Sequence, residues 1–340
     1  MSEAHPVKMT SPVVRACLLG FAIWSLMPGA RAQTCLTSTD MDEPTRTAVT
    51  SAAKKYFDMA AHGDTAGMQQ SAIPSVGSNF SGIAAAIKDN QPMLQGGQGT
   101  VRPPFVLKVE GSAPLERAEF LCGVFGSNGQ TANSAIFVIP NLPPGTYAVT
   151  TVDVSGTAEP YMVTFVLQQM GADWKLGGFY ARDSRAGTHD SQWFIDRAHE
   201  FKNKGQTRNA WLYLMEARSL AAPVSFQSTQ MTDKLYDEAQ AVKPADLPAD
   251  GPVNFVAGGK TYQLTQIFLQ AAANEIDLVV KYQSPDISNT TQTYQDNIAL
   301  IKALVAKFPE FRDGFGGVVT RAVAPSGQDY GSLLTMSNIK

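Results

Sequence analysis

Apolar side chains recur at helical spacing in the segment that begins near residue 43. The positions that carry this pattern are Val49, Ala53, Tyr56, Phe57 and Ala60. Such spacing places the apolar side chains on one face of a helix. Gly63 can take the left-handed conformation that closes a helix, and Asp64 can cap a second helix from Thr65 onward. Two consecutive helices are therefore predicted.

Beyond residue 105 the pattern changes to alternating apolar and polar positions, which is typical of strands with one buried face. The candidate strands are Phe105–Glu110, Ala118–Phe125, Ala135–Ile139, Thr146–Val154, Tyr161–Gln168 and Trp174–Ala181. Turn residues such as Pro143, Pro144 and Gly145 separate them. Helices followed by a long antiparallel meander predict an α+β domain over residues 43–183, with the sheet curled around the helices.

The rest of the chain contains two further blocks. Residues 191–242 show the spacing of a helical hairpin with Gly205 in its turn, and a third helix is expected near Met231–Ala241. Residues 243–252 are rich in proline, which disfavours both helix and strand, and are predicted to be a linker.

Residues 253–340 form the last predicted domain. Its expected elements are strands Tyr262–Leu269 and Ile276–Tyr282, a helix carrying Tyr294, Ile298, Ile301, Val305 and Phe308, and strands Val318–Ala324 and Gly331–Ile339. The predicted fold class is therefore α+β, with N-terminal helices packed on a curled antiparallel sheet, a middle helical hairpin and a C-terminal β-β-α-β-β sandwich.

The N-terminus has the layout of a secretory signal. Lys8 and Arg15 precede an apolar run over Ala16–Met27, and Ala30-Arg31-Ala32 offers a cleavage site. Because the run is shorter than the roughly 20 residues that a helical span needs, no membrane span is expected. We predict that residues 1–32 are a signal peptide cut near Ala32, and that the protein is periplasmic or secreted in a bacterium. A lipid anchor at Cys35 is the alternative, although Gln33 and Thr34 precede it where lipoprotein signals carry small residues.

Charge and cysteine content restrict the function further. Removal of residues 1–32 takes away three of 27 basic and one of 30 acidic residues, so the net charge becomes −5. A mildly acidic chain without a basic run lacks the footprint of a nucleic-acid-binding protein. Cys35 and Cys122 then remain in an oxidising compartment, where a structural disulfide between them is predicted.

Three segments of the first domain resemble parts of a known fold. The segment Tyr56–Asp64, together with Val163–Gln168 and Trp174–Tyr180, is similar to the first helix-turn and last hairpin of the ketosteroid-isomerase-like cone, also called the nuclear-transport-factor-two-like fold. The middle block resembles a single tetratricopeptide-like helical hairpin. Enzymes with the cone shape place acidic and phenolic groups at an apolar cavity. The resemblance implies Asp153, Asp64 and Tyr180 as catalytic candidates, and Tyr56 and Tyr161 as ligand-binding candidates.

Each candidate also has a structural interpretation. Asp64 fits a helix cap, and Tyr56 fits a core position in its helix. Asp153 shares a strand face with polar residues, and acidic side chains are rarely buried, so outward exposure is favoured. The three histidines beyond residue 32, at positions 62, 189 and 199, are scattered over different elements, so neither a metal site nor a cofactor is expected.

The sequence therefore predicts an exported, non-catalytic protein of the bacterial envelope that binds a ligand or docks to another protein. The expected partner is a small apolar ligand or an envelope protein. The alternative is an isomerase- or dehydratase-type enzyme that acts on a small apolar carbonyl compound in the cone-like domain.

Overall fold

The computed structural model of the protein describes residues 33–127, 129–272 and 275–340. The predicted signal peptide, residues 1–32, lies outside these ranges. The first helices are α1 (Glu43–Ala61), α2 (Thr65–Gln70), α3 (Pro74–Gly77) and α4 (Ser81–Leu94). Helix α1 begins where the Asp42 side chain accepts a hydrogen bond from the Thr45 amide at 2.7 Å, and it ends before Gly63, whose φ is +69°. Both predicted helices are thus present.

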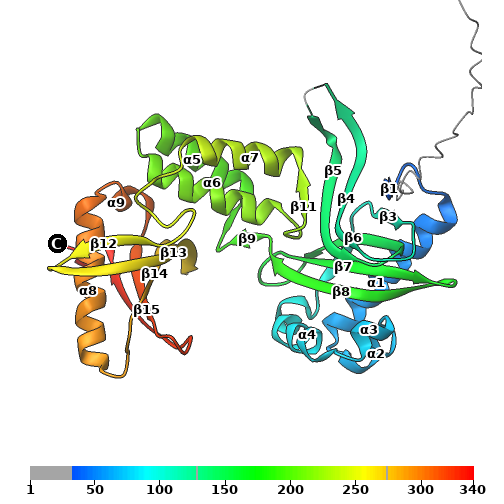
Figure 1. The fold of residues 1–340 in the computed structure, drawn as a ribbon, viewed down its shortest axis with the longest axis horizontal. Helices are drawn as coiled ribbons and strands as arrows, with labels where there is room; N and C mark the ends of the chain where they lie inside the picture. Colours follow the sequence, from blue (N-terminus) through cyan, green and yellow to red (C-terminus); the bar gives the residue numbers. More distant parts are fainter. Residues whose placement is uncertain (1–32, 128, 273–274) are drawn as a thin grey trace, which may run out of the picture. The chain divides into compact units, whose positions relative to one another are not determined.

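A six-stranded antiparallel sheet packs on these helices (Figure 1). Its strands are β1 (Gln33–Leu36), β2 (Gln98–Val101), β3 (Phe105–Val109), β6 (Gly145–Ser155), β7 (Tyr161–Met170) and β8 (Asp173–Asp183). The strand order is β1-β3-β6-β7-β8, and β2 also pairs with β6. Val163, Phe165 and Leu167 alternate along β7 and are buried in one core with Val49 and Phe57 of α1. The central strands β6 and β7 are buried on both faces, so the expectation of one buried face is wrong there. The face away from the helices packs against a second sheet.

Two of the predicted strands form a separate sheet instead of joining the meander. These are β4 (Leu115–Gly126) and β5 (Gly129–Leu142), and β11 (Gln227–Thr229) pairs with the free edge of β5. Gly123 lies at a bulge in β4 with φ +83°, where a Cβ atom would lie 2.0 Å from the Asn133 carbonyl oxygen. The predicted disulfide joins Cys35 of β1 to Cys122 of β4, with their Cα atoms 5.2 Å apart.

The middle block folds into the predicted helices. These are α5 (Ser191–Asn203), α6 (Thr207–Ala221) and α7 (Gln230–Ala241), preceded by the short strands β9 (Arg185–Ala186) and β10 (His189–Asp190). Gly205, with φ +73°, makes the turn between α5 and α6. Thr229 and Thr232 form a reciprocal capping box at the start of α7.

The C-terminal sheet has five strands, one more than expected. Its elements are β12 (Val253–Ala257), β13 (Lys260–Ala272), β14 (Glu275–Gln283), α8 (Thr290–Lys307), α9 (Phe311–Gly314), β15 (Gly317–Val323), β16 (Asp329–Thr335) and a short 3₁₀ turn (Met336–Asn338). The strand order is sequential, and only the β14–β15 pair is parallel, because α8 and α9 connect these two strands. The additional strand β12 directly follows the proline-rich segment, where the sequence pattern is too short to indicate a strand.

Helices α5 and α6 share one hydrophobic core with the C-terminal sheet and α8. Tyr213 of α6 illustrates this shared core. Its hydroxyl donates a hydrogen bond to the Gly314 carbonyl oxygen at 2.6 Å, and the centroids of its ring and the Phe315 ring are 6.0 Å apart. The predicted α+β class, with N-terminal helices, an antiparallel sheet, a middle helix pair and a C-terminal sheet with a helix, is confirmed. Throughout the described ranges, every helix is too short or too polar to cross a bilayer.

Candidate functional site

The two aspartates predicted as catalytic candidates have structural partners. The Asp64 carboxylate caps α2 by accepting a hydrogen bond from the Gly67 amide at 2.9 Å. The Asp153 carboxylate accepts two hydrogen bonds from the Arg102 guanidinium, at 2.8 and 2.6 Å, and both side chains are nearly half exposed. Neither Asp64 nor Asp153 is among the residues that line the two pockets described below.

The tyrosine candidates lie in three different environments. Tyr56 is buried, and its hydroxyl donates to the backbone carbonyl oxygens of Ser71 (2.8 Å) and Trp174 (3.2 Å). Tyr180 is 44% exposed and contacts the ring of Phe226. Tyr161 is buried, donates to the Asn90 side chain, and has its pKa raised to about 12, mainly by burial.

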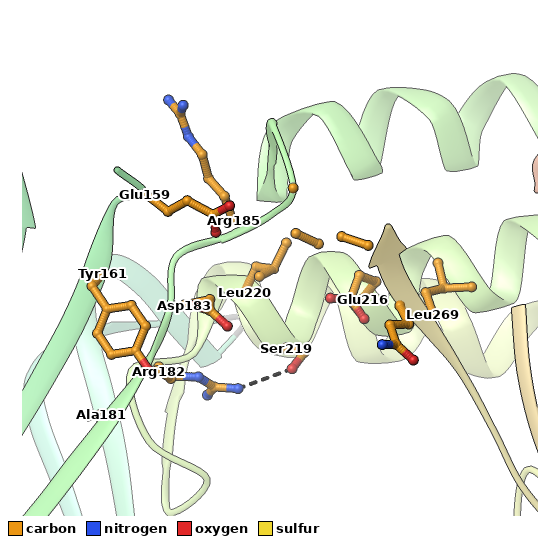
Figure 2. A pocket seen from close by; sticks show the side chains of 14 residues that line it. Glu159, Tyr161, Ala181, Arg182, Asp183, Arg185, Glu216, Ser219, Leu220 and Leu269 are labelled. Atoms are coloured by element: carbon orange, nitrogen blue, oxygen red, sulfur yellow. Dashed lines mark hydrogen bonds between the residues drawn. The ribbon is translucent and has the colours of Figure 1, made fainter. Parts of the chain in front are cut away.

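Only Tyr161 among these candidates belongs to the pocket that we take as the candidate site. This polar pocket has a volume of about 610 Å³. Its walls come from the start of β7, the end of β8, the short strand β9 and the turn after it, α6 and the end of β13 (Figure 2). The lining residues are Glu159, Tyr161, Ala181, Arg182, Asp183, Arg185, Ala186, Gly187, Glu216, Ser219, Leu220, Leu269, Gln270 and Ala271.

Local geometry explains why these side chains meet. The antiparallel register of β7 and β8 places Tyr161 opposite Asp183, so the start of one strand meets the end of the other. On α6, Glu216, Ser219 and Leu220 are spaced by three and four residues and share one helix face. Leu269 of β13 lies beside this face in Figure 2.

Arg182 is already held by the protein. Its Nη1 donates to the Ala222 carbonyl oxygen at 2.5 Å, and its Nη2 donates to the Ser219 hydroxyl at 3.1 Å. These bonds connect the end of β8 to the last turn of α6 and the residue that follows. Arg182 therefore contributes positive charge to the pocket, but its bonds already fix the position of its guanidinium.

The carboxyl groups of the pocket have no such partners. Within residues 33–127, 129–272 and 275–340, no hydrogen bond or ion pair reaches the carboxyl of Glu159, Asp183 or Glu216. Burial raises the pKa of Glu216 to about 7, and nearby Arg182 opposes this effect. Burial also raises the pKa of Asp183, and the charge of Glu159 adds to it. Glu159 and Asp183 are exposed to solvent, so the partly buried Glu216 is the carboxyl group of the pocket with unsatisfied capacity to accept hydrogen bonds and positive charge.

The carboxyl groups of this pocket suit a positively charged ligand. The described part of the chain contains no group of three or more His, Cys, Asp or Glu side chains that could hold a metal. Leu220 and Leu269, both largely buried, line the pocket next to the acidic groups and leave a small apolar area there. A ligand that combines a protonated nitrogen with an apolar part would fit both features.

Sequence reasoning missed Glu216 and Asp183. Glu216 is the one acidic residue in a helix where every residue over Asn209–Leu214 is buried. A lone carboxylate inside such an apolar stretch is a signal that could have identified it. Asp183 carries no comparable signal, because its setting depends on the pairing of β7 with β8.

Comparison of the chain with protein-family models, with curated proteins and with solved structures finds no match. The cone resemblance therefore stays a prediction, and the geometry of the pocket is the basis for a functional proposal.

Proposed function

We propose that this protein is an exported, non-catalytic binding protein of the bacterial envelope, periplasmic or secreted, and that its polar pocket holds a small organic amine. One observation carries the proposal: the partly buried Glu216 carboxyl lies in the pocket wall, and none of the residues that the structure describes hydrogen-bonds to it. A desolvated carboxylate is costly unless it is paired, and a protonated amine would supply the missing charge and hydrogen bonds.

The remaining walls support the same chemistry. Arg182 is bound to Ser219 and Ala222, and Arg185 is exposed, so three carboxyl groups face only two guanidinium groups. The apolar part of the ligand would lie against Leu220 and Leu269. This refines the expected small apolar ligand to one with an apolar body and a cationic end.

Export is supported by the Cys35–Cys122 disulfide, which fits an oxidising location outside the cytoplasm. The test is N-terminal sequencing of the protein recovered from its host's envelope and culture medium. A mature N-terminus near Gln33 is expected, whereas recovery of the intact N-terminus from the cytoplasm would contradict export.

Calorimetric titration of the purified protein with hexylamine tests the ligand class, with hexanol as the neutral comparison. Hexylamine is expected to bind at least about tenfold more tightly, because only the amine can pair with Glu216. The Glu216→Gln variant should lose this preference, while Glu116→Gln on the exposed part of β4 should keep it. Equal binding of amine and alcohol by the wild-type protein, or no binding of either, would contradict the proposal.

The second proposal is an isomerase- or dehydratase-type enzyme that acts on a small apolar carbonyl compound. The sequence predicts its site in the cone-like domain, and we place it instead in the polar pocket, which that domain shares with α6. The observation that favours it is the pKa of about 7 at Glu216, which suits a general acid or base near neutral pH. Asp64 and Asp153 support it less, because each carboxylate already serves a cap or an ion pair. Turnover of such a compound that disappears in Glu216→Gln or Asp153→Asn would favour the enzyme over the binding protein.

A further inference from the structure

A second hollow lies between the β4–β5 hairpin and helix α7, away from the residues of the polar pocket. Its volume is about 950 Å³, and we call it the hairpin groove. The residues that line it are Leu121, Phe125, Gly129, Gln130, Ile136, Gln230, Asp233, Lys234, Asp237 and Glu238. The hairpin supplies most of the apolar lining, and α7 supplies the charged lining.

The hairpin exposes large apolar side chains on its outer face. Leu121 is 59% exposed and lies directly opposite Ile136 across the β4–β5 pair. Val124 at the nearby bulge is 66% exposed. The inner face is covered, because Phe120 and Phe137 are buried in a core that the hairpin shares with β3 and β6. Adjacent apolar side chains on the solvent face of a strand pair are typical of a surface that another molecule covers.

The α7 wall of the groove is acidic. Asp233 and Asp237 are four residues apart and share one face of the helix, where Glu238 adjoins them and Lys234 is the single cation. Asp233 accepts a hydrogen bond from Gln130. Glu238 accepts one from His199 at 2.8 Å, and its other carboxylate oxygen lies 3.9 Å from Lys234 Nζ. Asp237 is exposed, and no hydrogen bond or ion pair within the described ranges reaches its carboxylate.

The two walls are held together before any partner binds. Strand β11, which leads directly into α7, pairs with β5 at Ser228 and Ile136. In addition, the Gln230 side chain donates to the Gln130 carbonyl oxygen at 2.9 Å. A groove with preformed walls loses less conformational entropy on binding.

We propose that the hairpin groove docks a segment of a partner protein that carries both cationic and apolar side chains. Its Lys or Arg side chains would pair with Asp237 and the neighbouring carboxylates, and its apolar side chains would cover Leu121 and Ile136. Charge decides against a second copy of this chain, because a symmetric contact through the groove would bring two acidic walls together. The same acidic wall repels nucleic acid and anionic lipid.

Fluorescence polarisation with three short labelled peptides tests the proposal on the purified protein. The first peptide alternates Lys with Leu, the second replaces Lys with Glu, and the third replaces Leu with Ser. We expect the Lys/Leu peptide to bind the wild-type protein. The Leu121→Ser variant should bind this peptide about tenfold more weakly, because it loses an apolar contact. Asp237→Lys should weaken binding by about fivefold or more, an effect that shrinks between about 50 and about 500 mM salt.

The control variants carry the same two substitutions, Leu to Ser and Asp to Lys, at exposed positions outside the groove. Leu333→Ser alters a 50% exposed leucine on β16, and Asp89→Lys alters an exposed aspartate on α4. Both should bind the first peptide like the wild-type protein. Because Asp237 is exposed on a helix, Asp237→Lys keeps the test valid if Leu121→Ser fails to fold, as circular dichroism would reveal.

Three results would overturn the proposal. One is equal binding of the Lys and Glu peptides, and another is equal loss of affinity in groove and control variants. The third is a wild-type dimer in sedimentation that Leu121→Ser converts to a monomer, because a second copy would then occupy the groove. None of these results depends on the polar pocket, so the two proposals can fail separately.

Discussion

Replacing Glu216 with glutamine should stabilise this protein at high pH and leave its stability nearly unchanged at low pH. Burial raises the pKa of Glu216 from 4.5 in the unfolded chain to about 7 in the folded protein. Since one pH unit corresponds to about 1.4 kcal/mol, the ionised side chain costs the folded state about 3 kcal/mol. This value is an upper limit, because the side chain is only partly buried and solvent screens its charge.

The direction follows from which state binds the proton more tightly. Below pH 4.5 the carboxyl is protonated in both the folded and the unfolded chain, so it has little effect on stability. Between pH 4.5 and about pH 7 only the unfolded chain releases the proton, and the folded state loses stability as the pH rises. Above pH 7 the full cost is present. Glutamine does not ionise, so the variant avoids this loss.

Urea unfolding of both proteins at pH 4.5 and pH 8 measures the effect. We expect the variant to exceed the wild-type protein by up to about 3 kcal/mol at pH 8 and by less than about 0.5 kcal/mol at pH 4.5. The control is Glu116→Gln, because Glu116 is exposed on β4. A difference between Glu216→Gln and the wild-type protein that stays constant with pH, or that reverses sign at pH 8, would refute the reasoning.

Three further expectations concern stability. The double variant Cys35→Ala/Cys122→Ala removes the disulfide, whose cysteines are 87 residues apart, and should lower the free energy of unfolding by about 4 to 5 kcal/mol. Urea unfolding measures this loss. As a control, dithiothreitol should destabilise the wild-type protein but not the double variant. Asn297→Ala removes a buried amide that hydrogen-bonds the side chains of Tyr282 and Ser332 and the Tyr330 carbonyl oxygen. Thermal unfolding should show that the free energy of unfolding falls by about 3 kcal/mol. Asn254→Ala, at an exposed position, should leave it unchanged. Asp153→Asn breaks a half-exposed ion pair and should cost less than about 1 kcal/mol in the same assay.

Local sequence signals predicted much of the architecture. The helical spacing around Val49 and Phe57, and the turn at Gly63, depend on interactions within a few residues, which the sequence displays directly. The Asp64 cap is local in the same sense. The disulfide was predictable for another reason, because only Cys35 and Cys122 remain beyond residue 32.

Contacts between distant segments were decided only by the tertiary structure. Strand β11 joins β5 across about ninety residues of chain and adds a third strand to the separate β4–β5 sheet. This pairing brings α7 beside the hairpin and forms the groove. Arg102 meets Asp153 through the pairing of neighbouring strands, which gives a candidate base an ion-pair partner. The Glu216 pocket likewise needs β8, α6 and β13 together. Sequence periodicity shows which face of an element is apolar, but it does not show which distant element will cover that face, because the partner is selected by packing over the whole chain.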